Sequence, residues 1–181
     1  MDAIEYIDIL NKDGSMTGDK ALRSDVHSKG LWHLSVHVWV INDKGELLLQ
    51  KRSPNKENYP NLWDIPSAGH VTAGDSSLET AVRETSEELS IKLPKEDFVL
   101  VASIKESAVS NGGLYINNEF NDIYLVKSNI ELEDIKIQAE EVSEIKFISQ
   151  EELKRMVGDN HSNLVAHPEE YRILFKYLED K

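Results

Sequence analysis

The chain has 181 residues, a formal net charge of -13 at pH 7 and 40% hydrophobic residues, enough for the core of an ordinary domain. It contains no cysteine, which excludes disulfides, thiolate metal sites and cysteine nucleophiles and fits a cytoplasmic protein. The acidic surface argues against long nucleic acid as a partner. We expect neither a signal peptide nor a membrane span, because no stretch of about 18 apolar residues occurs.

Strands dominate the predicted secondary structure, because alternating apolar residues recur along most of the chain. In chain order, the expected strands span residues 3–10, 17–26, 31–41, 46–53, 97–107, 114–128 and 143–149. The first two form an N-terminal hairpin over about residues 1–25. The third carries alternating apolar residues on one side: Leu34, Val36, Val38 and Val40. Three prolines mark residues 53–69 as a loop.

Helical spacing of apolar residues appears in three segments of the chain. These segments span residues 76–89, 149–157 and 168–180. Many strands with few helices indicate an α/β fold in which a mixed sheet packs between helices. Since no linker divides the sequence, we expect a single domain over residues 1–181.

The first predicted helix begins with a capping box formed by Ser76 and Glu79. One side of this helix is an apolar stripe made of Leu78, Ala81, Val82, Thr85 and Leu89. The other side carries Glu84, Glu87 and Glu88 at spacings that make them neighbours on the helix surface. Their mutual repulsion is not relieved by any lysine at helical spacing. A solvated face would explain them, but converging carboxylates are also what Mg²⁺ or Mn²⁺ requires.

The wider frame of this helix distinguishes the two interpretations. The stretch "GHVTAGDSSLETAVRETSEELSI", residues 69–91, resembles the Nudix box, a pattern of one glycine, a glutamate, an Arg-Glu pair and further glutamates at fixed offsets. The matching residues are Gly69, Arg83, Glu84, Glu87, Glu88 and Ile91. Three positions depart from the pattern: Asp75 replaces a glutamate, Thr85 an apolar residue and Ser90 a glycine. None of these departures removes the carboxylate of Glu84, Glu87 or Glu88.

This resemblance implies a Nudix-type α/β/α sandwich and hydrolysis of a diphosphate linkage. It implies that Glu84, Glu87 and Glu88, with the carbonyl of Ala68, bind Mg²⁺ or Mn²⁺. Arg83 would orient the acidic cluster. The metal would neutralise phosphate oxygens and acidify a bound water. The general base would be Glu84 or a glutamate of a later loop, for which Glu141 is the first choice.

The substrate-binding residues are less specified by the pattern. Lys51 and Arg52 could approach the phosphates, although solvation at the surface explains them equally well. The expected partner is a small-molecule diphosphate: nucleoside diphosphates or triphosphates, nucleotide sugars, thiamine diphosphate and short prenyl diphosphates all stay open. Homodimers are common among Nudix proteins, so a homodimer is compatible with the resemblance.

Residues 27–70 also look like type I isopentenyl-diphosphate isomerase, itself a Nudix-fold enzyme. That isomerase holds a metal with three histidines and two glutamates, and the matching positions here are His27, His33, His70, Glu119 and Asn117. It also needs a cysteine where this chain has Ala68, and alanine cannot transfer a proton. The sequence therefore predicts a hydrolase of the isomerase-like branch. The alternatives are an isomerase-like enzyme and a Nudix module that binds a nucleotide or diphosphate without cleaving it.

Overall fold

The computed structural model describes residues 5–159 and 163–181 of the chain. Within them, the strands are Tyr6–Leu10 (β1), Met16–Leu22 (β2), Trp32–Ile41 (β3), Leu47–Arg52 (β4), Trp63–Asp64 (β5), Ser67–His70 (β6), Val99–Ser110 (β7), Tyr115–Lys127 (β8) and Val142–Ile148 (β9). The α-helices are Arg23–Lys29 (α1), Ser77–Leu89 (α2), Gln150–Gly158 (α3) and Pro168–Glu179 (α4). Short 3-10 helices span Lys95–Asp97, Asn111–Gly113 and Leu132–Asp134.

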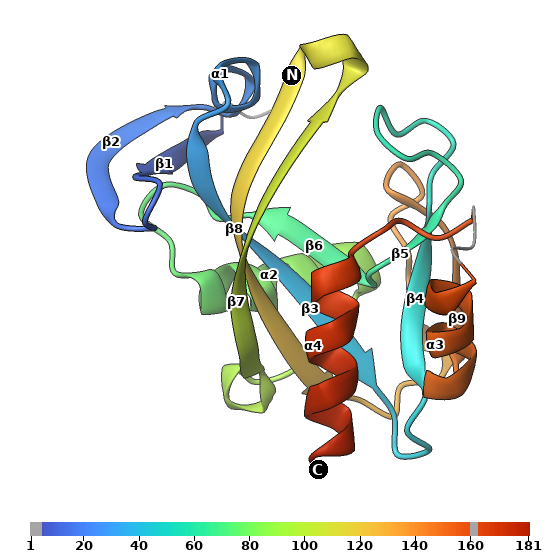
Figure 1. Ribbon diagram of the computed structural model, residues 1–181. Helices are drawn as coiled ribbons and strands as arrows, with labels where there is room; N and C mark the ends of the chain where they lie inside the picture. Colours follow the sequence, from blue (N-terminus) through green and yellow to red (C-terminus); the bar gives the residue numbers. More distant parts are fainter. Residues whose placement is uncertain (1–4, 160–162) are drawn as a thin grey trace.

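The central strand of the sheet is β3 (Figure 1). It runs parallel to β8 along its whole length, from Trp32 opposite Asn118 to Ile41 opposite Lys127. The remaining strand pairs are antiparallel: β1 with β2 and β3, β3 with β4 and β6, β4 with β5 and β9, and β7 with β8. The sheet is therefore mixed, as the sequence predicts.

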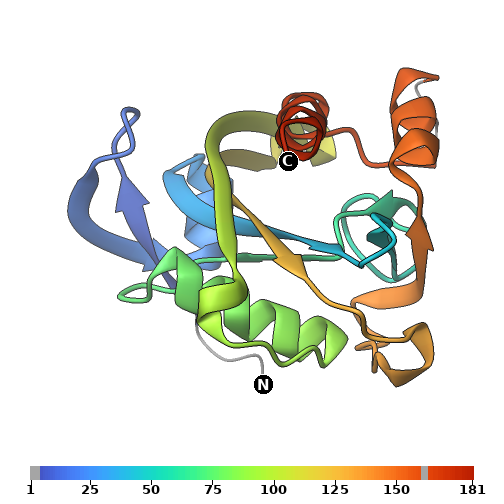
Figure 2. The same ribbon diagram turned by 90° about the horizontal axis from the view of Figure 1, so that it is seen from below.

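Helices cover both faces of the sheet (Figure 2). On one face, the fully buried Val36, Val38 and Val40 of β3 belong to a core that includes Ala81 and Leu89 of α2. On the other face, Trp39 belongs to a second core, with Leu153 of α3 and with Tyr171 and Leu174 of α4. Alternate residues of β3 therefore point into two hydrophobic cores, one on each face of the sheet. The predicted α/β/α sandwich is confirmed.

The structure corrects two local predictions. Residues 17–26 do not form one strand, because β2 ends at Leu22 and α1 begins at Arg23. Helix α1 buries Val26 and His27 and ends at Gly30, whose φ of 61° is the left-handed conformation that glycine adopts without strain. Residues 53–69 contain the short strands β5 and β6 in addition to loop. Strand β5 has two residues and lies between prolines, whereas β6 has four residues and begins directly after Pro66; both are too short to show a period.

In the N-terminal hairpin, Leu10 of β1 pairs with Trp32 of β3, and Ile7 forms an isolated bridge with Thr72, just after β6. Its second strand, β2, lies at the sheet edge and is largely exposed. Among the described helices, none has the length and apolar character needed to cross a bilayer.

Candidate active site

The acidic helix α2 begins where the sequence predicts. The Ser76 hydroxyl accepts a hydrogen bond from the Glu79 backbone N–H at 3.2 Å, and the Glu79 carboxylate accepts one from the Ser76 N–H at 3.1 Å. This reciprocal capping box satisfies two of the unpaired N–H groups of the first turn. Strand β6 lies directly upstream and packs against the helix, so the box glycine and the box glutamates face each other.

Gly69 lets the Glu84 carboxylate approach the strand. A Cβ at position 69 would lie 2.3 Å from both Cδ and Oε1 of Glu84, far inside van der Waals contact. Gly69 has an ordinary extended backbone here, so glycine is needed for space and not for an unusual φ. The box glycine therefore makes room for a carboxylate that is mostly covered by protein.

Glu88 is the most deeply buried of the three glutamates, with 8% of its surface exposed. Its Oε2 accepts a hydrogen bond from the Ala68 N–H at 3.2 Å. Burial, followed by the charge of Glu84, raises the pKa of Glu88 to about 8. Burial also raises the pKa of Glu84, in spite of its contact with Arg83. Glu88 and the largely covered Glu84 both resist ionisation. A divalent cation bound beside them would stabilise the ionised form of both carboxylates.

Arg83 joins the two less buried glutamates. Its Nη1 lies 2.8 Å from Oε1 of Glu84 and 3.1 Å from Oε2 of Glu87. The Glu87 side chain is 55% exposed and lies at the rim of the cluster. Arg83 thus contacts both Glu84 and Glu87, and its orienting role stays a prediction.

The structure shows the surroundings of the three residues that depart from the box pattern. Thr85 is fully buried, and its hydroxyl donates to the Ala81 carbonyl at 2.8 Å, so it occupies the apolar face without an unpaired donor. Ser90 ends the helix with a φ of 55°, the left-handed conformation in which glycine is unstrained. Asp75 donates its backbone N–H to Thr72 in the turn before the helix.

Glu141 lies in the turn before β9, and its charge contributes to the raised pKa of Glu88. The carboxylate of Glu141 forms an ion pair with Lys56 of the loop that follows β4. Lys56 was not selected from the sequence, because a lysine in the polar segment "SPNKEN" carries no signal of a tertiary contact. The structure brings this cation next to the glutamate predicted as a base.

The two predicted phosphate-binding residues point to other partners. Lys51 forms an ion pair with Glu144, its cross-strand neighbour, at 2.6 Å. Arg52 donates from Nε to the Asn58 carbonyl at 3.1 Å and from Nη1 to Oδ2 of Asp64 at 3.0 Å. Within the described residues, neither side chain contacts the box carboxylates.

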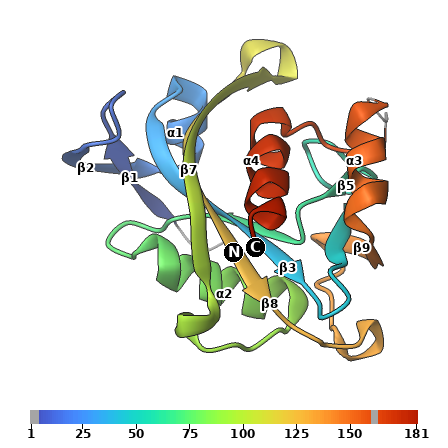
Figure 3. The same ribbon diagram turned by 60° about the horizontal axis from the view of Figure 1, so that its bottom comes forward.

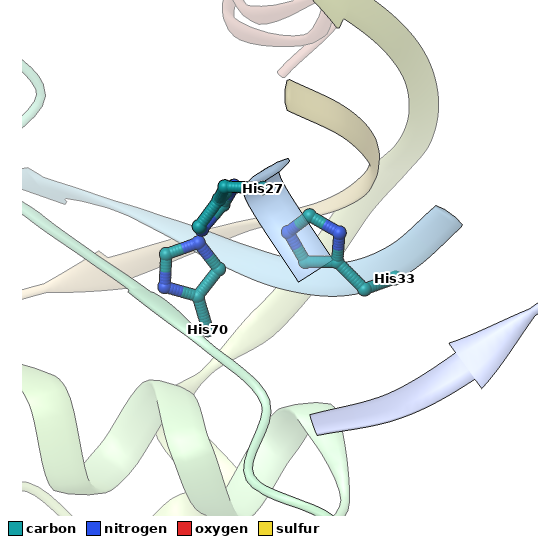
Figure 4. Close-up of side chains that lie close together, drawn as sticks. All are labelled: His27, His33 and His70. Carbon is teal, nitrogen blue, oxygen red and sulfur yellow. The ribbon is translucent and has the colours of Figure 1, made fainter. Parts of the chain in front are cut away.

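The three histidines of the second resemblance converge from α1, β3 and β6 (Figure 4). His27, His33 and His70 each offer a ring nitrogen within 4.8 Å of the others. His33 Nε2 and His70 Nε2 both lie 3.3 Å from Oε1 of Glu119. Both nitrogens of His27 are buried without a hydrogen-bond partner among the described residues. Burial, followed by the charges of His70 and His33, lowers the pKa of His27 to about 4.

A buried polar network that the sequence did not reveal lies beside β3, on the face covered by α4. Glu170 accepts hydrogen bonds from His37 Nδ1 and Trp39 Nε1, both at 2.7 Å. Asp64 contacts His167 Nε2 at 2.9 Å and also holds Arg52. These residues are far apart in the sequence, so no local pattern could have grouped them.

The sequence pattern described as NUDIX domain matches residues 31–167. The chain is 42% identical to Nudix hydrolase 3 of Arabidopsis thaliana across 99% of its own length, but it spans only 24% of that relative. It is 35% identical to an uncharacterised Nudix hydrolase of Clostridium acetobutylicum, covering 90% of this chain and 78% of that one. It is 32% identical to an isopentenyl-diphosphate isomerase of Gibberella zeae, covering 72% of this chain and 56% of that one.

Among solved structures, one from Deinococcus radiodurans aligns with a TM-score of 0.69 over 95% of this chain and 98% of the other, at 20% identity. This likeness concerns the fold. The box residues, their arrangement on α2 and the match over most of the chain agree with one another. The chain belongs to the Nudix hydrolase family.

Proposed function

We propose that the protein is a Mg²⁺- or Mn²⁺-dependent pyrophosphohydrolase that cleaves a diphosphate linkage in a nucleoside-diphosphate-type or other organic diphosphate. The observation that carries this proposal is the burial of Glu88 beside Glu84, with a pKa raised to about 8. Arg83 pairs with Glu84, but no cation among the described residues pairs with Glu88, and a bound divalent cation would reverse this penalty.

The residues fit such a cation by their chemistry. Glu84, Glu87 and Glu88 would supply hard carboxylate oxygens, and the Ala68 carbonyl would add a neutral one. When bound, the ion supplies charge neutralisation on the phosphate oxygens and acidity for the attacking water. Arg83 keeps Glu84 directed toward the strand.

The proton of the attacking water needs an acceptor, and Glu141 is the residue that we assign first. Its carboxylate lies close enough to Glu88 to influence the pKa of that residue. Lys56 forms an ion pair with Glu141 and so fixes the position of the carboxylate that would accept the proton. The water oxygen forms the new bond to phosphorus while the bridging P–O bond breaks, and the leaving phosphate carries away the electron pair. Glu84 is the alternative base.

The test is a hydrolysis assay with Mg²⁺ and a panel of nucleoside diphosphates and triphosphates, nucleotide sugars, thiamine diphosphate and short prenyl diphosphates. Products are scored as released phosphate, pyrophosphate and monophosphate. Glu88→Gln should reduce turnover by orders of magnitude, because it removes a charge from the cation site. The control is Glu151→Gln, an exposed glutamate in the first turn of α3.

Two other activities are separated by the same assay. An isopentenyl-diphosphate isomerase would convert its substrate without phosphate release, but Ala68 offers no group for proton transfer. A binding module would raise its melting temperature with a panel compound and release no product. Either result in the wild-type protein would contradict the hydrolase proposal.

We further assign the histidine cluster as a second metal centre. The orphaned nitrogens of His27, together with His33, His70 and Glu119, match the imidazole and carboxylate ligands of a divalent transition metal. Metal analysis by mass spectrometry tests this assignment without relying on turnover. His70→Ala should lower the bound Zn²⁺ or Mn²⁺ by about one equivalent, and an unchanged metal content would contradict it.

A further inference from the structure

A cavity of about 230 Å³ lies between β7 and the first turn of α4. Strand β7 and helix α4 lie next to each other (Figure 3). The cavity is lined by residues 104–107 of β7 and residues 167–170 at the start of α4. None of the proposed metal ligands lines it. The cavity thus needs an explanation of its own.

Glu106 supplies a hydrogen-bond acceptor to this cavity. The residue lies opposite Glu119 in the β7–β8 register and is half-buried. Its Oε2 accepts from Nδ2 of Asn121 at 3.1 Å, whereas Oε1 accepts no hydrogen bond from the described residues. Asn121 is itself fully buried and accepts from the Ser35 hydroxyl through Oδ1. A network behind Glu106 therefore holds one carboxylate oxygen and leaves the other available.

His167 supplies a donor from the opposite wall. Its Nε2 contacts Asp64, and its Nδ1 is buried without a partner among the described residues. Burial lowers the pKa of His167, but the hydrogen bond and charge of Asp64 outweigh this effect and raise it. When the ring is protonated, Nδ1–H is a donor that no described residue accepts.

Glu170 also lines the cavity but is committed to the protein. Both of its oxygens accept hydrogen bonds, one from His37 and one from Trp39. His37, His167 and Glu170 are close enough to hold a metal ion. Because the Glu170 oxygens are already engaged, we interpret this group as the support of the cavity wall.

The cavity is connected to the acidic site through β3 and β6. His37, which contacts Glu170, is the cross-strand partner of Ala68. Among the described strands, β6 pairs with β3 alone, and the Ala68 N–H of β6 donates to Glu88. Ala68 thus lies between Glu88, which accepts its N–H, and His37, which contacts a residue of the cavity wall.

We propose that this cavity binds the organic moiety of the diphosphate substrate, and that Glu106 selects a hydroxyl-bearing, ribose-like group by accepting its hydrogen bond. Glu106 offers a hydroxyl-bearing group an acceptor on one wall of the cavity, and His167 lies on the other wall. A prenyl chain would leave these polar groups desolvated and unpaired, and a further phosphate would meet the Glu106 charge. The inference deepens the proposed function and rests on it.

The test compares the nucleoside diphosphate that the protein hydrolyses fastest with its 2′,3′-dideoxy analogue. Wild-type kcat/KM should favour the diol by about tenfold or more, the scale of one charge-assisted hydrogen bond. Glu106→Ala should bring the ratio close to one, because the hydrogen bond to the diol is lost. Glu151→Gln should leave the ratio unchanged. The melting temperature checks that the Glu106→Ala variant is folded.

An unchanged ratio in Glu106→Ala, or a preference of the wild type for prenyl diphosphates, would overturn the inference while leaving the hydrolase proposal intact. If the wild type hydrolyses no compound of the panel, the hydrolase proposal fails. In that case, calorimetric titration with the two nucleotides tests whether Glu106 recognises the diol. Tighter binding of the diol, lost in Glu106→Ala, would support its role. Equal binding, or no binding of either nucleotide, would overturn it.

Discussion

Gly69→Ala tests whether the box glycine serves the carboxylate of Glu84. The added Cβ would meet Cδ and Oε1 of Glu84 at 2.3 Å, whereas ordinary contact begins at 3.4 Å. Glu84 must therefore move by about 1 Å. A displacement of this size in a reacting constellation costs on the order of 100-fold in rate. The backbone of residue 69 accommodates alanine, so we expect the fold to persist.

The assay measures kcat on the best panel substrate, the affinity for Mn²⁺ and the melting temperature. Gly158→Ala is the matched control, because a Cβ at that position meets nothing within 4 Å. We expect Gly69→Ala to lose turnover and Mn²⁺ affinity at a nearly unchanged melting temperature. Turnover within about twofold of wild type would refute the argument that Gly69 positions Glu84.

Three further predictions concern stability. Because the pKa of Glu88 is raised from 4.5 to about 8, the folded metal-free protein retains a proton there that the unfolded chain releases, so its free energy of unfolding should fall as the pH rises through this window. Urea unfolding with a chelator should show Glu88→Gln gaining on wild type from pH 5 to pH 8; a constant difference would contradict this. Ser90→Gly should raise the free energy of unfolding by up to about 1 kcal/mol, since φ is 55° at this helix end, and a loss of stability would count against that reasoning. Glu170→Ala should cost about 3–5 kcal/mol in urea unfolding, because His37 and Trp39 lose a buried partner; a cost below about 1 kcal/mol would show that the pair is dispensable.

The sequence predicts those parts of the fold that depend on local repetition. Alternation identifies β3 and its two faces, and helical spacing with a capping box identifies α2. Strands β5 and β6 were missed because four residues or fewer cannot display a period. Their existence depends on pairing with β4 and β3, which are distant in the chain.

The candidate site divides in the same way. The box glutamates are close in sequence and recognisable by spacing, and the three histidines could be named only through a resemblance. Other residues of interest are defined by contacts with partners 15 to 133 positions away in the sequence: Glu106, Lys56 and Glu170. An isolated charged residue in the sequence gives no sign of such a contact. Tertiary pairing therefore decides which charges serve the proposed site.

The most direct test of the account is a Mn²⁺ titration of the metal-free protein, followed by electron paramagnetic resonance, in wild type, Glu88→Gln and Glu151→Gln. All three proteins also carry His70→Ala, so that Mn²⁺ bound by the histidine cluster does not contribute to the titration. The account predicts that Glu88→Gln weakens one class of Mn²⁺ sites by at least about tenfold, the scale of one lost charged ligand, and that Glu151→Gln changes nothing. Equal Mn²⁺ binding by wild type and Glu88→Gln would contradict the claim that the buried glutamates of α2 form the metal site.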